Sequence, residues 1–111
     1  MTVTYSSYLH LDELLAAQEP LSDGPEHDEM LFIVIHQVYE LWFKQLLHEV
    51  AHLAVALERD DLPRVYATLK RFLTILKVQV AQIDILETMS PVSFLSFRAR
   101  LDTASGFQSP Q

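Results

Sequence analysis

The chain has 111 residues, which is enough for one small domain, and half of them are hydrophobic. Its net charge of −7 argues against a nucleic-acid partner and against docking on anionic lipid, because both need a basic surface. It has no cysteine, which excludes disulfides and thiolate chemistry.

The amino-terminal residues 1–10 carry neither the basic start nor the apolar run of a signal peptide. No stretch of the chain approaches the ~20 apolar residues of a membrane-spanning helix. We therefore expect a cytoplasmic protein with no membrane partner. A domain this small hides little surface, so its high apolar content indicates contact with another chain, and we expect a homo-oligomer.

The first predicted helix covers about 11–18 and stops before Pro20, because the residue that precedes a proline disfavours the helical conformation. The following segment, EPLSDGP, has the composition of a loop.

The second predicted helix covers about 26–58. Pro25 is tolerated at its start, and apolar residues recur at steps of three and four from Leu31 to Leu57. The apolar arc is wide, which indicates burial on more than one side.

The third predicted helix covers about 62–88, with Asp61 as its N-cap and Pro63 in its first turn. Only a few residues separate it from the second helix, so the two should pack as an antiparallel hairpin. A short fourth helix at about 91–101 and a loop tail at 102–111 complete the chain. The fold class is all-α: a single helical domain, 1–111, made of a long antiparallel hairpin with short flanking helices.

The run from His48 to His52 matches the pattern H-E-x-x-H, which can hold zinc on a helix with the glutamate as general base. No third ligand follows, because residues 53–57 are all apolar. We therefore interpret His48 and His52 as surface residues and predict no metal ligand in this chain. A zinc hydrolase is kept as an alternative that metal analysis would settle.

His36 shares a stripe with Phe32, Tyr39 and Phe43. A lone histidine on an apolar face is usually a core residue with its hydrogen bonds satisfied. A neutral imidazole there could instead hydrogen-bond a polar atom of an aromatic ligand.

Arg98 lies close to Phe94 and Phe97 in the fourth predicted helix. Its guanidinium must either reach solvent or find an anion, and its geometry suits a carboxylate. Ser105 and Gly106 form a weaker signal, since this pair usually marks a turn.

Four segments of the chain resemble, in order, the amino-terminal region of the tryptophan 2,3-dioxygenase family. They are YSSYLHLDELL, PLSDGPEHDEMLFIVIHQVYELWFKQLLHE, LETMSP and FRARLDTASGFQS. The resemblance implies an all-helical homotetramer that binds haem b. Such an enzyme inserts both atoms of O2 across the C2–C3 bond of the indole of L-tryptophan. The product is N-formylkynurenine, and the reaction is the first step of the kynurenine pathway.

The resemblance also implies roles for single residues. The distal side of the haem pocket would be lined by Phe32, Ile33, Val34, Ile35 and His36. Phe32 would pack on the indole and contact the haem, and His36 would accept or orient the indole N–H as the catalytic residue.

At the other end of the substrate, Arg98 would clamp the carboxylate beside Phe94, which stands where some members have a tyrosine. Ser105 and Gly106 would lie near the haem and the substrate ammonium. Tyr5, Tyr8 and Leu9 would belong to an arm that reaches into the pocket of a neighbouring subunit.

The histidine that ligates haem iron in this family lies in the carboxy-terminal half, beyond the residues of this chain. Since haem needs a strong axial ligand, we expect the isolated chain to have little or no activity. A non-catalytic helical oligomerisation or interaction module is the alternative function.

Overall fold

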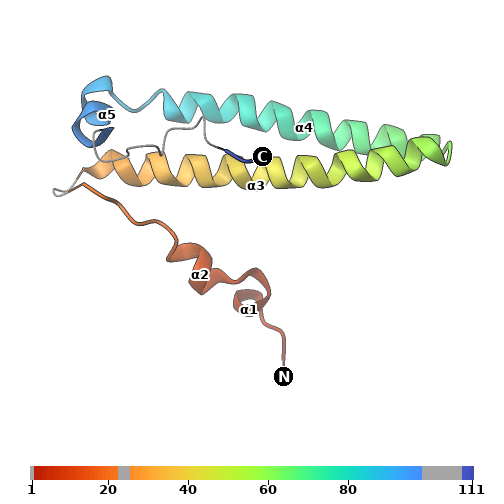
Figure 1. Ribbon diagram of the computed structural model, residues 1–111, viewed down its shortest axis with the longest axis horizontal. Coiled ribbons are helices and arrows are strands. Elements are labelled where there is room, and N and C mark those ends of the chain that lie inside the picture. The colour runs from red at the N-terminus through yellow and green to blue at the C-terminus, as the bar shows by residue number, and fades with distance from the viewer. Residues whose placement is uncertain (1, 23–25, 99–108) are drawn as a thin grey trace.

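The computed structural model describes residues 2–22, 26–98 and 109–111. Its helices are α1 (Tyr5–Leu9), α2 (Leu11–Leu15), α3 (His27–Glu58), α4 (Leu62–Leu86) and α5 (Pro91–Arg98). Figure 1 shows α3 and α4 as a long antiparallel pair, with short helices before and after it. This confirms the predicted all-α fold with its helical hairpin.

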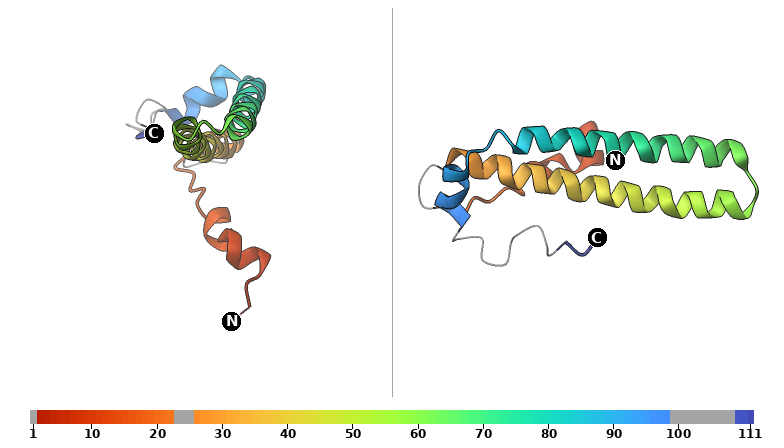
Figure 2. Two further views of the ribbon diagram at one scale, coloured as in Figure 1. Left: turned by 90° about the vertical axis from the view of Figure 1, so that its right-hand side faces the viewer. Right: turned by 90° about the horizontal axis from the view of Figure 1, so that it is seen from above.

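The hairpin turns within three residues. Asp60 takes a left-handed conformation with φ 52°, which brings the chain back on itself. Asp61 then caps α4 by accepting a hydrogen bond from the backbone nitrogen of Arg64 at 3.3 Å. Because the connection is so short, α3 and α4 lie side by side along most of their lengths, as both views in Figure 2 show.

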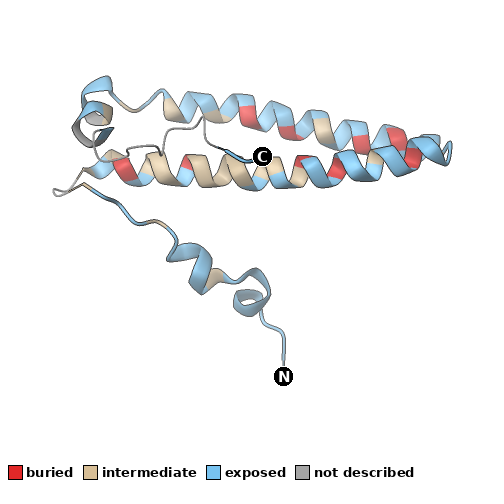
Figure 3. Ribbon diagram, in the orientation of Figure 1, coloured by how far each residue is buried: buried red, intermediate tan, exposed pale blue. Residues whose placement is uncertain are grey.

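The core is a narrow seam between these two helices. Its buried hydrophobic residues are Ile35, Leu46, Ala56, Val65 and Ile75. Figure 3 shows the buried positions of α4 confined to part of its length, with exposed positions between them. The hydroxyl of Tyr39 crosses the seam and donates a hydrogen bond to the backbone oxygen of Gln79 at 2.5 Å. A single helix pair encloses little volume, so many large apolar side chains remain exposed.

The amino-terminal segment differs from the prediction. The helix expected over about 11–18 ends at Leu15, and α1 precedes it where no helix was predicted. The cause of α1 is a reciprocal capping box, in which the Thr4 and Ser7 side chains each bond the backbone nitrogen of the other. His10, with φ 54°, separates the two helices by a sharp bend.

The arm formed by residues 2–22 leaves the hairpin at an angle and carries α1 away from it (Figures 1 and 2). At the same end of the hairpin, α5 packs across the beginning of α3. The molecule therefore measures 55 × 41 × 23 Å. Within the described ranges, no helix combines the length and the apolar character that crossing a membrane requires.

Candidate functional site

His36 lies on the first half of α3 with its imidazole against Phe32. The Nδ1 atom is 2.7 Å from the backbone oxygen of Phe32, and the two ring centroids are 4.3 Å apart. A carbonyl oxygen can only accept, so Nδ1 carries the proton of this hydrogen bond. In the neutral imidazole, Nε2 is then left as a hydrogen-bond acceptor.

α5 brings a second aromatic ring and a cation to the same place. The ring of Phe94 lies 5.7 Å from that of Phe32, centroid to centroid, at a tilt of 38°. The guanidinium carbon of Arg98 lies 6.0 Å from the centroid of Phe94, which is within cation–π range. Four residues predicted from separate segments, on α3 and α5, therefore form one continuous cluster.

The three residues between Phe32 and His36 point in different directions, because successive residues of a helix are about 100° apart. Ile35 is only 7% exposed and belongs to the seam between α3 and α4. Ile33 is half-buried and Val34 is exposed. Phe32 and His36, four residues apart, share one face of α3, on which Phe32 contacts Phe94 of α5.

A hollow of about 400 Å³ lies beside His36, between α3 and the arm. It is lined by Leu14, Ala17, His36, Gln37, Glu40, Leu41, Lys44 and Gln111. The hollow offers an apolar wall with a few polar groups, which is the usual make-up of a small-molecule site.

Glu40 lies one helical turn beyond His36 and is not among the site residues predicted from the sequence. Its side chain and backbone oxygens accept hydrogen bonds from Nε2 of Gln111 at 2.5 and 2.9 Å. Hydrogen bonds from Ser109 and Gln111 lower the pKa of Glu40, desolvation opposes them, and electrostatic attraction to His36 lowers the pKa further. The i, i+4 spacing from His36 was the available signal.

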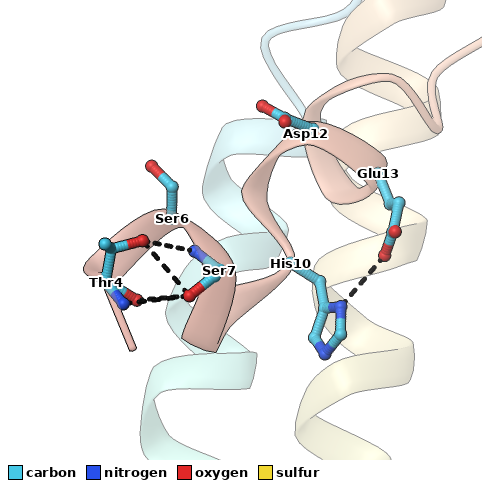
Figure 4. A pocket seen from close by; sticks show the side chains of 6 residues that line it. All are labelled: Thr4, Ser6, Ser7, His10, Asp12 and Glu13. Carbon is cyan, nitrogen blue, oxygen red and sulfur yellow. Dashed lines mark hydrogen bonds and ion pairs between the residues drawn. The ribbon is translucent and has the colours of Figure 1, made fainter. Parts of the chain in front are cut away.

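The predicted arm residues are not close to this cluster within one chain. Tyr5 and Tyr8 are 75% and 74% exposed, Leu9 is also exposed, and Figure 1 places α1 well away from α5. A second hollow, of about 480 Å³, lies on the arm itself (Figure 4). Its lining is polar and contains none of the predicted site residues: Thr4, Ser6, Ser7, His10, Asp12 and Glu13.

The H-E-x-x-H segment does not present three ligands together. His48 and His52 are exposed, whereas Glu49 is buried at 4% exposure. Glu49 accepts a hydrogen bond from Gln45 at 2.7 Å and pairs with Arg71 of α4 at 3.5 Å. Among the described residues, no three His, Cys, Asp or Glu side chains gather as a metal site would require. The predicted residues Ser105 and Gly106 lie outside the described residues.

Comparison with known proteins gives a consistent result. The family model for tryptophan 2,3-dioxygenase matches residues 1–111. The tryptophan 2,3-dioxygenases of Herpetosiphon aurantiacus and of Anaeromyxobacter sp. strain K are 60% and 62% identical over 109 residues. That of Caulobacter vibrioides is 53% identical over 109 residues.

Each of these alignments covers 98% of this chain, but only 42%, 40% and 41% of the respective relative. The chain thus spans about two fifths of the length of the curated relatives it matches. With a family model that matches from the first residue to the last, the chain belongs to the tryptophan 2,3-dioxygenase family.

Proposed function

We propose that this chain forms the substrate-binding portion of a tryptophan 2,3-dioxygenase. The reaction is haem-dependent insertion of O2 into the indole of L-tryptophan to give N-formylkynurenine, the first step of the kynurenine pathway. The observation that carries the proposal is the cluster of Phe32, His36, Phe94 and Arg98 at the junction of α3 and α5.

The chemistry of this cluster complements that of tryptophan. The substrate presents a flat apolar ring, one N–H donor and one carboxylate. Phe32 and Phe94 offer aromatic faces, and Nε2 of His36 offers an acceptor that its own helix orients through Nδ1. The guanidinium of Arg98 can bind the carboxylate through two parallel hydrogen bonds.

Phe94 supplies a ring without a hydroxyl, so Arg98 alone anchors the carboxylate on α5. The loss of one hydrogen bond from a tyrosine hydroxyl to a carboxylate weakens binding by about 1.5–3 kcal/mol, because the acceptor is charged. The proposal extends to Ser105 and Gly106, near the haem and the substrate ammonium, and to Ile33, Val34 and Ile35 along the distal side.

Haem is the group that activates O2 in this reaction. Phe32 offers it an apolar contact, but the described residues do not complete a haem site. Apart from His36, the histidines among them are exposed: His10, His27, His48 and His52. We propose that the axial histidine comes from the part of the relatives' length that this chain does not span, and that the chain alone has little or no activity.

The exposed arm fits assembly of a homo-oligomer, a tetramer by analogy with the family. We propose that Tyr5, Tyr8 and Leu9 of one subunit contribute to the pocket of a neighbour in the cytoplasm. A purely non-catalytic interaction module is not favoured, because the curated relatives are named as dioxygenases.

A haemin titration of the purified chain, with free imidazole supplied as the axial ligand that the chain lacks and with and without L-tryptophan, tests this function. We expect tryptophan to shift the absorption band of bound haemin. Arg98→Ala should weaken that response by about tenfold or more, because a carboxylate left without its cation is desolvated at a cost. His48→Ala is the control on α3, since His48 is exposed and far from α5. A band indifferent to tryptophan in the unsubstituted chain would overturn the proposal.

A further inference from the structure

Gln37, the residue after His36, connects the arm to α3 by hydrogen bonds of its side chain. The side-chain oxygen of Gln37 accepts a hydrogen bond from Nε2 of Gln18 at 2.8 Å. Its side-chain nitrogen donates to the backbone oxygen of Ala17 at 2.9 Å. The side-chain amide of Gln37 therefore bonds two consecutive residues of the arm, one through its nitrogen and one through its oxygen. Gln18 and Gln37 are both half-buried.

Gln18 is itself held in place for this contact. Its Nε2 also donates to the backbone oxygen of Leu14 at 2.9 Å, in the last turn of α2. The end of α2 is thus joined through Gln18 to α3, and the orientation of the arm follows from the position of Gln37.

A second attachment lies about two helical turns nearer the beginning of α3. Glu29 is only 1% exposed, and its carboxylate accepts hydrogen bonds from the backbone nitrogens of Leu21 and Ser22 at 2.8 and 3.0 Å. Charge-assisted bonds of this kind fix the arm's connection to the hairpin. The connection alone does not fix the direction of α2, because residues 16–20 between them form no helix.

The attachment at Gln37 shapes the hollow beside His36. Leu14 and Ala17 of the arm form one wall of that hollow, and His36 and Glu40 of α3 form part of the other. Release of the arm would remove one wall and expose the imidazole to water.

We propose that Gln37 is a positioning residue: it docks the arm beside His36, the one residue that the hollow shares with the ligand site at the junction of α3 and α5, and ligand binding and arm docking are thereby coupled through His36. The inference rests on the proposed function for the identity of the ligand, L-tryptophan. Coupling is reciprocal: a substitution that releases the arm lowers the affinity for the ligand, and bound ligand stabilises the docked position of the arm.

The arm can be followed directly, because the chain has no cysteine. Spin labels at Ser6→Cys on α1 and Ala51→Cys on α3, both exposed, report the distance between arm and hairpin by electron paramagnetic resonance. The full chain is compared with Gln37→Ala, which loses both bonds, and Gln37→Glu, which keeps only the acceptor for Gln18. His48→Ala is the matched control on the same helix.

The labelled chain is diluted with excess unlabelled chain, so that distances between subunits do not contribute. We then expect a single narrow distance in the unsubstituted chain and in His48→Ala, and a broad distribution in Gln37→Ala. Gln37→Glu should be intermediate. The tryptophan response of the haemin band should weaken in the same order, by roughly threefold to tenfold in Gln37→Ala, the effect of one or two modest hydrogen bonds.

Two results would overturn the proposal: an unchanged distance in Gln37→Ala, or a released arm with an unchanged tryptophan response. The first needs no ligand, so it is independent of the proposed function. The proposed function is contradicted if the haemin band of the unsubstituted chain does not respond to tryptophan. In that case the distance between the spin labels still tests whether Gln37 docks the arm.

Discussion

One imidazole nitrogen of His36 donates a hydrogen bond to the backbone of its own helix, and the other can accept a hydrogen bond from a ligand. The bond from Nδ1 to the backbone oxygen of Phe32 fixes both the ring orientation and the tautomer. This arrangement favours a ligand with an N–H donor and disfavours one that presents an acceptor at the same position.

A methyl group on the indole nitrogen should reveal this preference. 1-Methyl-L-tryptophan has no indole N–H to donate, so it should bind about tenfold more weakly than L-tryptophan in the haemin-band titration, as expected for a lost hydrogen bond. In His36→Ala the two ligands should bind alike, because no acceptor remains to distinguish them. If the ratio of the two affinities were the same in the unsubstituted chain and in His36→Ala, His36 would not contact the indole nitrogen.

Glu40 should titrate below the ordinary range of a glutamate. Hydrogen bonds from Ser109 and Gln111 lower its pKa, so they stabilise the charged form. The attachment of residues 109–111 is thus present at neutral pH and is lost as the pH falls through the folded pKa. Carbon-detected NMR of the Glu40 carboxyl should give a low midpoint, which the double substitution Ser109→Ala, Gln111→Ala raises. A midpoint insensitive to that substitution would contradict the assigned cause.

Single-residue chemistry was only partly predictable. His36 and Arg98 stand out because each is a polar group on an apolar stripe. Gln37 and Glu40 carry no such signal, since a glutamine or glutamate on a long helix is usually solvated. Their partners come from residues 17–18 and 109–111, far away in sequence.

At the scale of elements, the hairpin was predictable and the arm was not. Long runs of apolar residues at steps of three and four specify α3 and α4. α1 has only five residues and depends on a box made by Thr4 and Ser7, where serine replaces the more usual Glu or Gln. The predicted helix over 11–18 continued too far, because α2 ends in a tight turn. There the oxygen of Leu14 accepts hydrogen bonds from the backbone nitrogen of Ala17 at 3.3 Å and from the side chain of Gln18 at 2.9 Å.

The N-cap of α4 should contribute measurably to stability. Asp61→Ala removes the acceptor for the backbone nitrogen of Arg64 and the ion pair between the two side chains. We expect a loss of about 0.5–1 kcal/mol in the free energy of unfolding by urea, because the 3.3 Å bond is long and the ion pair is exposed. Asp61→Asn should retain most of the stability. A loss of the same size in Asp61→Asn would indicate that the ion pair dominates.

At the scale of the whole molecule, the exposed apolar surface exceeds what a small monomer normally shows. Exposed large side chains occur on the arm, for example Leu15, and on α4, for example Leu73 and Val80. We expect the sedimentation coefficient of the chain to rise with concentration. Leu73→Glu and Val80→Glu should reduce that rise, since a charge opposes burial of the α4 surface. A sedimentation coefficient independent of concentration would mean that this surface does not meet a second copy.

The hairpin is closed at one end by a three-residue turn and open at the end that holds the site. Of the buried hydrophobic residues in the described part of the chain, Ala56 and Val65 lie beside the turn, Leu46 and Ile75 lie midway, and Ile35 alone lies toward the open end. Near the open end the two long helices are linked by Tyr39 and Gln79. Amide hydrogen exchange should therefore run as a gradient, slowest beside the turn and fastest around His36. The end of the protein that binds the ligand is then the end that unfolds locally first. A ligand bound there therefore stabilises the hairpin against this local unfolding.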